Sequence, residues 1–399
     1  MNILFLDQYS DLGGAQACLL DLMPAIRDRG WTAHAAVPGA GPLVERLGSL
    51  GVVVHGICGG RYRSGTKRLA DFLRFPYDIA RQTRTIRRLL DQTQFDVVYV
   101  NGAQLLPAAS IAVQTAVQGR VPIVFHAHWR YAGAAAMAAR WSIRRSGAAV
   151  VACCRYVTAP LSAAVECLNV IPNGVAGRGF RERPFDAAAG FRIGIIGRIA
   201  PEKGQAEFLR AAALLAPEFP NARFVICGAP LFADQRYEEE VRRRALGLPV
   251  EFLGWRDDIA SVLRQLDLLV IASSEEGLPR VLLEAFSAGV PVVAFPAGGI
   301  PEALEDERTG FLVQPSSAEA LAARIRTLMT GDLTRLREVA HNARSAWERF
   351  YDLSHYRRGI TNLLAALAPA SPAGVRTLAP PLRTPPPQAA VPGSIPADR

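Results

Sequence analysis

Short apolar runs alternate with helix-length amphipathic segments along most of the chain. The first run, at residues 2–6, precedes a Gly-Gly loop and a segment with helical spacing at residues 16–29. Further apolar runs lie at residues 33–37, 52–57, 97–100, 123–126, 148–152 and 169–171. Strands that alternate with helices form parallel sheets covered on both faces. The pattern therefore predicts an α/β fold for the first half.

The alternation restarts after a segment rich in glycine and arginine. Residues 177–184 read Gly-Arg-Gly-Phe-Arg-Glu-Arg-Pro, a composition typical of an interdomain linker. Strands are then predicted at residues 191–196, 222–227, 250–253, 268–271 and 291–295, with helices at 205–215 and 236–246. We predict two Rossmann-like domains that face each other across a cleft, with ligands at the carboxyl ends of the strands.

These patterns divide the chain into five segments. The predicted boundaries are 1–178 for the first domain, 179–190 for the linker, 191–345 for the second domain, 346–367 for a closing helix and 368–399 for a tail. The closing helix has an apolar face that includes Trp347, Tyr356 and Leu364. The tail contains nine prolines from residue 369 onward and is predicted to be disordered.

The sequence also predicts a cytoplasmic protein. No run of about 18 uncharged apolar residues is present, which argues against a transmembrane helix. The N-terminal apolar run ends at Asp7 and lacks a preceding basic segment, so it is not typical of a signal peptide. The six cysteines are scattered without repeated metal-ligand spacing, which is typical of reduced packing residues inside cells.

The whole chain has a net charge of +9, and its positive charge is concentrated in the first half. Residues 1–185 contain 21 Lys and Arg against 11 Asp and Glu, whereas residues 186–399 contain 24 against 25. The basic residues include Arg61, Arg63, Lys67, Arg68 and Arg74, and then, at helical spacing, Arg81, Arg84, Arg87 and Arg88. They form either a solvated face or a patch for an anionic membrane surface. Nucleic acid is a less favoured alternative, because no recognisable nucleic-acid-binding motif of interleaved basic and aromatic residues accompanies the charge.

The most informative segment, residues 268–289, joins a strand to a helix. The pattern predicts a strand that ends near Ala272, a polar loop, and a helix with Pro279 at its first position and Gly289 at its end. Glu276 then lies in the loop and Glu284 in the second helical turn.

Between these two carboxylates, the free amides of Gly277 and Leu278 would bind an anion at the helix N-terminus. A nucleotide sugar, with phosphates between two polyols, has this shape. Alternatively, Glu276 is an exposed acid at the helix start, where the helix dipole favours it, and Glu284 is an ordinary surface residue. However, Glu284 lies among apolar residues and would then require a partner.

A second group of charges follows the first strand of the second half. Residues 193–204 place Arg198 and Lys203 five positions apart in a glycine-bearing loop. A planar guanidinium and a flexible ammonium suit a diphosphate, although cations after a strand are common. Gly14 belongs to a similar loop after the first strand of the chain, where glycine serves either a close ligand approach or a tight turn.

Together these motifs resemble the retaining GT-B glycosyltransferases of family 4, also called glycosyltransferases group 1. The resemblance rests on the Glu-x₇-Glu pair, on the Gly197-Arg198…Lys203-Gly204 loop and on Gly13-Gly14. Residues 172–175 and 291–302 also match, and the likeness covers roughly residues 1–365 in the expected order.

The resemblance implies a role for each donor-binding residue. Arg198 and Lys203 would neutralise the donor diphosphate, Glu276 would bind hydroxyls of the donor sugar, and Glu284 would bind the ribose. The amides of Gly277 and Leu278 and the loop at Gly14 would also contact the donor.

The resemblance further implies a first-domain histidine near the reacting carbon of the sugar. His126 is the predicted residue, and His128 is the competing choice. With Glu276, Lys203 and Arg198, it would form the catalytic set. In retaining enzymes of this fold the leaving phosphate assists attack from the same face, while the protein supplies positioning and electrostatic stabilisation.

The implied function is retaining hexosyl transfer from a UDP- or GDP-sugar to a glycan or lipid-linked acceptor, in cell-surface polysaccharide or glycolipid synthesis. The first domain would lie on the acceptor side, at the inner face of the membrane, with the closing helix crossing back to it. No cofactor is implied, and without an Asp-x-Asp triplet no metal is indicated. Two alternatives stay open: a nucleotide-sugar epimerase on the same scaffold, and a non-catalytic nucleotide-sugar-binding subunit.

Overall fold

The computed structural model of the chain describes residues 1–59, 69–117, 119–180, 185, 190–231 and 235–368. The predictions for the proline-rich tail, for most of the linker and for Arg61, Arg63, Lys67 and Arg68 lie outside the described residues.

A seven-stranded parallel sheet forms the first domain, in the order β3-β2-β1-β4-β5-β6-β7. The strands are β1 (Asn2–Asp7), β2 (Thr32–Pro38), β3 (Val53–Ile57), β4 (Val97–Asn101), β5 (Ile123–Ala127), β6 (Ala149–Ala152) and β7 (Leu168–Val170). The central strands β1, β4, β5 and β6 are almost entirely buried, which explains their continuous apolar sequences.

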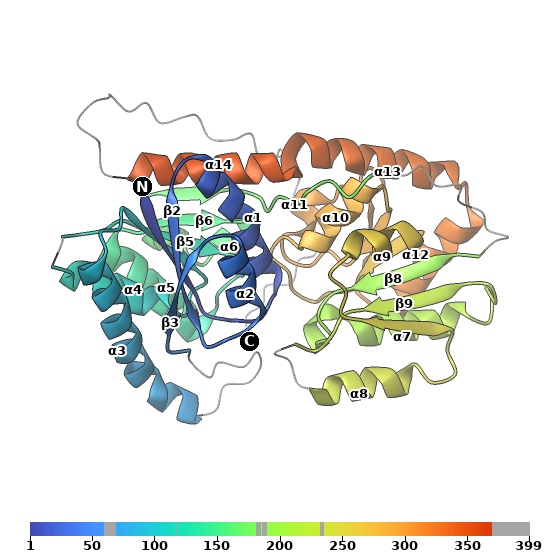
Figure 1. Cartoon of the computed structure of the whole chain (residues 1–399). Helices are drawn as coiled ribbons and strands as arrows, with labels where there is room; N and C mark the ends of the chain where they lie inside the picture. The colour runs from blue at the N-terminus through green and yellow to red at the C-terminus, as the bar shows by residue number, and fades with distance from the viewer. Residues whose placement is uncertain (60–68, 118, 181–184, 186–189, 232–234, 369–399) are drawn as a thin grey trace.

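Helices cover both faces of this sheet (Figure 1). They are α1 (Gly14–Asp28), α2 (Pro42–Ser49), α3 (Leu69–Gln92), α4 (Leu106–Thr115), α5 (Gly133–Ser146) and the short α6 (Arg155–Thr158), with η1 (Ser162–Ala164). Alternate strand residues serve the two faces: Leu4 packs with α3, α4 and α5, whereas Ile3 packs with α1. The helices α3, α4 and α5 lie side by side on one face.

The second domain repeats the design with a six-stranded parallel sheet, in the order β10-β9-β8-β11-β12-β13. Its strands are β8 (Arg192–Ile196), β9 (Arg223–Cys227), β10 (Val250–Gly254), β11 (Leu268–Ile271), β12 (Val292–Ala294) and β13 (Phe311–Leu312). Its helices are η2 (Pro201–Lys203), α7 (Gln205–Leu215), α8 (Gln235–Arg244), α9 (Ile259–Gln265), α10 (Arg280–Ala288), α11 (Ile300–Ala303), α12 (Ala318–Thr330) and α13 (Thr334–Ala346). The predicted fold class, two Rossmann-like α/β domains, is confirmed.

The C-terminal part of the chain returns to the first domain, as predicted, but not as one helix. A π-helical turn, η3 (Trp347–Tyr351), is followed by Asp352 in an extended conformation, and α14 (Leu353–Leu367) starts anew. The Asp352 carboxylate accepts a hydrogen bond from the Ser354 amide at 2.9 Å, so it caps the new helix. The predicted uninterrupted helix is therefore wrong at this break. Figure 1 shows α14 lying across the first domain, where it packs on α1.

Candidate active site

The loop between β11 and α10 lies at the carboxyl end of the second sheet, where ligands are expected. The helix begins at Arg280 with Pro279 as its N-cap, so the predicted start is one residue early. Gly289 ends it in the left-handed conformation, as predicted, with φ 72°. Glu276 thus lies in the loop and Glu284 inside the helix.

Glu276 is buried and held by two donors. Its side chain is 7% exposed, and its Oε1 lies 2.5 Å from Lys203 Nζ and 2.8 Å from Ser273 Oγ. A buried carboxylate requires such partners, because its desolvation otherwise costs several kcal/mol. A backbone hydrogen bond also joins the segment after β11 to the segment after β8, since the Ser274 amide donates to the Glu202 carbonyl at 3.0 Å. The structure therefore brings Lys203 and Glu276 together.

Arg198 lies on the same edge and forms an ion pair with Glu202. The Gln205 side chain donates to the Arg198 carbonyl at 2.9 Å and fixes the loop after β8. Burial raises the pKa of the Tyr9 phenol in the first domain. The cation of Arg198, which belongs to the second domain, acts in the opposite direction and lowers this pKa. The Arg198 cation is therefore near enough to the loop after β1 to act on Tyr9.

Glu284 has a different partner from Glu276. The Nη2 of Arg178 donates to its Oε1 at 2.8 Å, and the Arg178 amide lies 3.3 Å from Ser287 Oγ. Oε2 of Glu284 has no hydrogen-bond partner among the residues that the structure describes. The sequence predicted that this buried glutamate requires a partner, but it did not identify the linker arginine.

The two candidate histidines occupy different environments. His126 is completely buried inside β5, with its Nδ1 2.6 Å from the Tyr99 hydroxyl. Its Nε2 is buried without a hydrogen-bond partner. His128 follows the strand and is half-buried, with its ring centroid 3.8 Å from that of His126. The structure does not expose the predicted His126 to a ligand, whereas it leaves part of His128 accessible.

A polar network orients His128 at the carboxyl ends of β1, β4 and β5. Asn101 Nδ2 donates to Asp7 Oδ2 at 2.6 Å, so its Oδ1 faces His128 Nε2 at 2.7 Å. Because an amide oxygen only accepts, Nε2 carries the proton and Nδ1 is left as an acceptor. Burial, together with the Arg280 cation, lowers the pKa of His128 to about 3, so its ring is neutral near pH 7.

The second-domain loops pack directly against the first domain. A Cβ at Gly277 would lie 2.4 Å from the His128 carbonyl oxygen, so only glycine allows this close approach. The Asn173 side chain of the first domain donates to the Leu278 carbonyl of the second domain at 2.8 Å, which gives a further contact between the two domains. At Gly14, by contrast, a side chain would fit, because a Cβ there would make an ordinary van der Waals contact of 3.8 Å with Arg280 Cδ.

Arg280 crosses between the domains and was not assigned a role from the sequence. Its Nη2 is 2.7 Å from Asp21 Oδ2, and its Nη1 donates to the Gly174 carbonyl at 3.2 Å. It belongs to the motif segment, so its position after Pro279 was visible. Its partner on α1 was not, because the two residues are 259 positions apart.

The charged groups suit a phosphorylated, hydroxyl-rich ligand. Two cations and two carboxylates lie in the segments that follow β8 and β11 at the carboxyl edge of the second sheet, opposite a neutral histidine and the buried Asp7. Among the described residues, no group of three or more His, Cys, Asp or Glu is arranged to hold a metal ion. In the same residues, no helix is both long and apolar enough to cross a membrane.

Comparison with known proteins places the chain in a family. A model described as Glycosyltransferase Family 4 matches residues 12–176, and one described as Glycosyl transferases group 1 matches residues 190–331. The chain therefore belongs to the glycosyltransferases of family 4, group 1.

Individual relatives match over shorter stretches. The D-inositol 3-phosphate glycosyltransferase of Corynebacterium glutamicum (strain R) is 31% identical over 166 residues, 39% of this chain and 40% of that protein. Sulfoquinovosyl transferase SQD2 of Arabidopsis thaliana is 34% identical over 145 residues, 35% of this chain and 27% of that protein. The matched regions thus span two fifths or less of these relatives.

Among solved structures, Anabaena Alr3699/HepE in complex with UDP and glucose is similar over nearly the whole chain. The TM-score is 0.76 with 27% identity, over 92% of this chain and 100% of that chain. The GT-B arrangement of two Rossmann-like domains is therefore shared.

Proposed function

We propose that the protein is a retaining hexosyltransferase that moves a sugar from a UDP- or GDP-sugar to a glycan or lipid-linked acceptor. The observation that carries this proposal is the buried Lys203–Glu276 pair, which lies at the carboxyl edge of the second sheet and beside the loop packed on His128. The Anabaena protein, which was solved with UDP and glucose, supports a nucleotide-sugar donor.

In this proposal, cations hold the diphosphate and carboxylates hold the polyols. Lys203 has three donor hydrogens, so one can stay on Glu276 while another contacts a phosphate oxygen. Arg198 supplies planar bidentate contacts to the same group. As negative charge develops on the leaving diphosphate, both cations stabilise the transition state without a change of position.

The carboxylates and His128 would orient the donor sugar and ribose. Glu276 accepts hydrogen bonds from sugar hydroxyls, and Glu284 offers the ribose the oxygen that Arg178 does not use. The neutral His128 presents Nδ1 to a further sugar hydroxyl, while Asn101 fixes its tautomer. The same-face attack assisted by the leaving phosphate then needs only positioning, with no protein nucleophile.

Donor turnover in matched variants tests the proposal. We expect Lys203→Ala and Glu276→Gln each to lower the release of nucleoside diphosphate in the presence of membrane acceptor extract by about a hundredfold or more. Glu240→Ala, which removes an exposed carboxylate on α8, should leave turnover unchanged. Near-normal turnover by both site variants would overturn the donor-site assignment.

A thermal-shift panel of UDP-, GDP- and ADP-sugars identifies the donor, because ligand binding to the folded state raises the melting temperature. Free sugar epimerised without an acceptor would instead favour an epimerase. Donor binding without any turnover would favour a non-catalytic subunit.

We also propose that the protein acts in the cytoplasm, at the inner face of a membrane, in cell-surface polysaccharide or glycolipid synthesis. The arginines of α3 support this proposal: Arg81, Arg84, Arg87 and Arg88 are exposed. The apolar side of the same helix, including Ile86 and Leu90, packs into the core. Only the charged side of α3 is therefore available to an anionic surface.

A further inference from the structure

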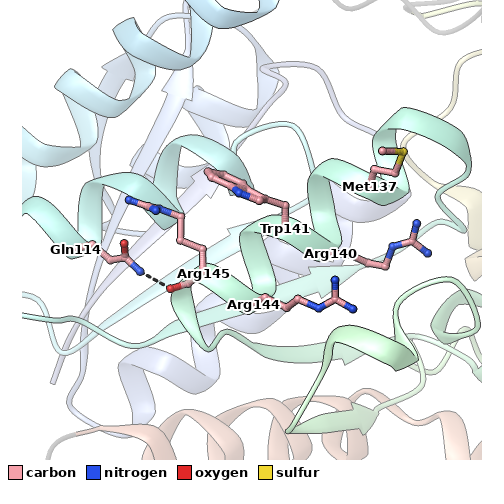
Figure 2. A pocket seen from close by; sticks show the side chains of 6 residues that line it. All are labelled: Gln114, Met137, Arg140, Trp141, Arg144 and Arg145. Carbon is pink, nitrogen blue, oxygen red and sulfur yellow. Dashed lines mark hydrogen bonds between the residues drawn. The ribbon is translucent and has the colours of Figure 1, made fainter.

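The helix α5 presents exposed apolar and basic side chains on one face (Figure 2). Met137, Arg140, Trp141 and Arg144 are spaced by three and four residues, which places them on the same side of the helix. With Arg145 and Gln114 of α4, they line an open depression of about 650 Å³. We call these six residues the α5 surface.

Two large apolar side chains of the α5 surface face solvent. Met137 is 64% exposed and Trp141 is 47% exposed. Val117, two residues after the end of α4, is 80% exposed. Exposed apolar side chains that occur singly need no explanation, but a group of them beside cations marks an interaction surface.

Arginines predominate around these side chains. From residue 97 to residue 165 the sequence contains six arginines and no Asp or Glu. Arg120 donates to the Ser146 carbonyl at 2.8 Å, and Arg144 to the Ala163 carbonyl at 3.2 Å. Within the described part of the chain, neither these two arginines nor Arg140 or Arg145 forms an ion pair with a carboxylate. Their charges are therefore available to an anionic partner.

The α5 surface extends the basic face formed by α3, because α3, α4 and α5 pack side by side. A carboxylate in this area, Asp91 at the end of α3, already lies 3.5 Å from Arg87 and accepts a hydrogen bond from the Val117 amide. None of the α5-surface residues contacts the Lys203–Glu276 site. The surface therefore has no evident part in donor binding.

We propose that the α5 surface docks the protein on a membrane that contains anionic lipids. The arginines contact the head groups, while Trp141 and Met137 enter the interfacial layer, where an indole ring is particularly stable. The guanidinium of Arg145 lies 5.5 Å from the Trp141 ring centroid, so cation and ring reach the interface together. A single-stranded nucleic acid would need several aromatic rings along a groove, and this surface has one.

This inference rests on the membrane association proposed above and identifies the surface responsible. It is tested by flotation of the full chain with vesicles of phosphatidylcholine alone or mixed with phosphatidylglycerol. We expect binding to the mixed vesicles only, weakened about tenfold or more in Arg144→Glu/Arg145→Glu, because each basic residue contributes about 1 kcal/mol at such a surface. Trp141→Ala should weaken it severalfold. Arg243→Glu, at an exposed arginine on α8 of the second domain, should bind as the wild type does.

Different failures have different meanings. Unchanged binding by the Arg144→Glu/Arg145→Glu and Trp141→Ala variants would overturn the α5 surface, while leaving α3 as the contact. Equal binding to neutral and anionic vesicles would overturn docking on anionic lipids, and binding to neither would overturn the membrane association altogether. Release of nucleoside diphosphate from a donor, measured on the same preparations without vesicles, shows separately whether the variants are folded and whether the donor site works.

Discussion

His126 and His128 are separated by one residue, yet the end of β5 gives them different environments. Residues i and i+2 of a strand share a face, so the sequence alone could not choose between them. His126 lies inside β5 and is hydrogen-bonded to the Tyr99 hydroxyl, whereas His128 lies beyond the end of β5. We expect His128→Ala to lower the turnover number about a hundredfold with little change in melting temperature.

His126→Ala should do the opposite. It removes a buried ring and its bond to Tyr99, which costs roughly 2–4 kcal/mol of stability, while the folded fraction keeps its turnover. Steady-state kinetics and urea unfolding on both variants separate the two effects. Loss of turnover in a fully stable His126→Ala protein, with an active His128→Ala protein, would restore the original assignment.

The buried carboxyl of Asp7 makes stability depend on pH. Burial raises its pKa to about 6, against the pKa of about 4 for an Asp in an unfolded chain. Between these values the unfolded state has released its proton while the folded state retains it. The free energy of unfolding therefore falls as pH rises through this window, by about 3 kcal/mol.

Urea unfolding at about pH 4 and about pH 7 measures this fall. We expect Asp7→Asn, which cannot ionise, to lose less stability than the wild type as pH rises between the two conditions. Asp28→Asn, at an exposed position on α1, should behave as the wild type does. The same pH dependence in all three proteins would contradict the role of Asp7.

Local motifs identified the candidate donor residues, but long-range contacts did not follow from the sequence. Glu276 and Glu284 were found from their spacing, because both belong to one loop and helix. The partner of Glu284 lies in the linker, 106 residues away, where one arginine among several gives no signal. Ser273 was inside the motif segment, but nothing in its neighbourhood predicted that its hydroxyl reaches Glu276.

At the scale of elements, buried parallel strands were predictable because their apolar runs are continuous. The run at residues 268–271 matches β11 at both ends, and most other strands differ by one residue. The strand β13 has only two residues, too few for a pattern. The break at Asp352 was missed because the apolar residues on either side keep helical spacing, although the backbone leaves the helix there.

The short helix α6 receives its N-terminal cap from the other domain. Its own N-cap residue, Cys154, provides no side-chain hydrogen bond. Instead, the Glu302 carboxylate accepts bonds from the amides of Arg155 at 2.8 Å and Tyr156 at 2.7 Å. We expect Glu302→Ala to lower the free energy of unfolding by about 1–2 kcal/mol, because two backbone amides at the start of the helix lose a charged acceptor.

Hydrogen exchange gives the specific measurement for this cap. The amides of Arg155 and Tyr156 should lose protection in Glu302→Ala, while amides in β1 should not. Glu338→Ala, at an exposed position on α13, serves as the matched control. Unchanged exchange at both amides would show that the cap does not couple the domains.

At the scale of the molecule, the two domains are joined by more than the linker. Arg280 of α10 bonds to Asp21 of α1, and α13, which packs on α10, leads through η3 into α14 on the first domain. The Trp347 indole donates to the Val175 carbonyl at 3.2 Å, which ties η3 to the chain that enters the linker. The C-terminal segment therefore bridges both cores.

Tyr356 attaches the C-terminal segment to the first domain, so its substitution tests how the two domains are coupled. Its side chain is almost fully buried, its hydroxyl donates to the Cys18 carbonyl at 3.3 Å, and it packs against Gly174 at the entrance to the linker. We expect Tyr356→Ala to cost about 3–5 kcal/mol, through lost packing and a remaining cavity. Because that loss falls on the connection between the cores, calorimetry should change from one cooperative transition to two. The control variant Tyr77→Ala, which removes an exposed ring on α3, should keep the single transition. If Tyr356→Ala also unfolded in a single transition, the linker and Arg280 would suffice to couple the domains.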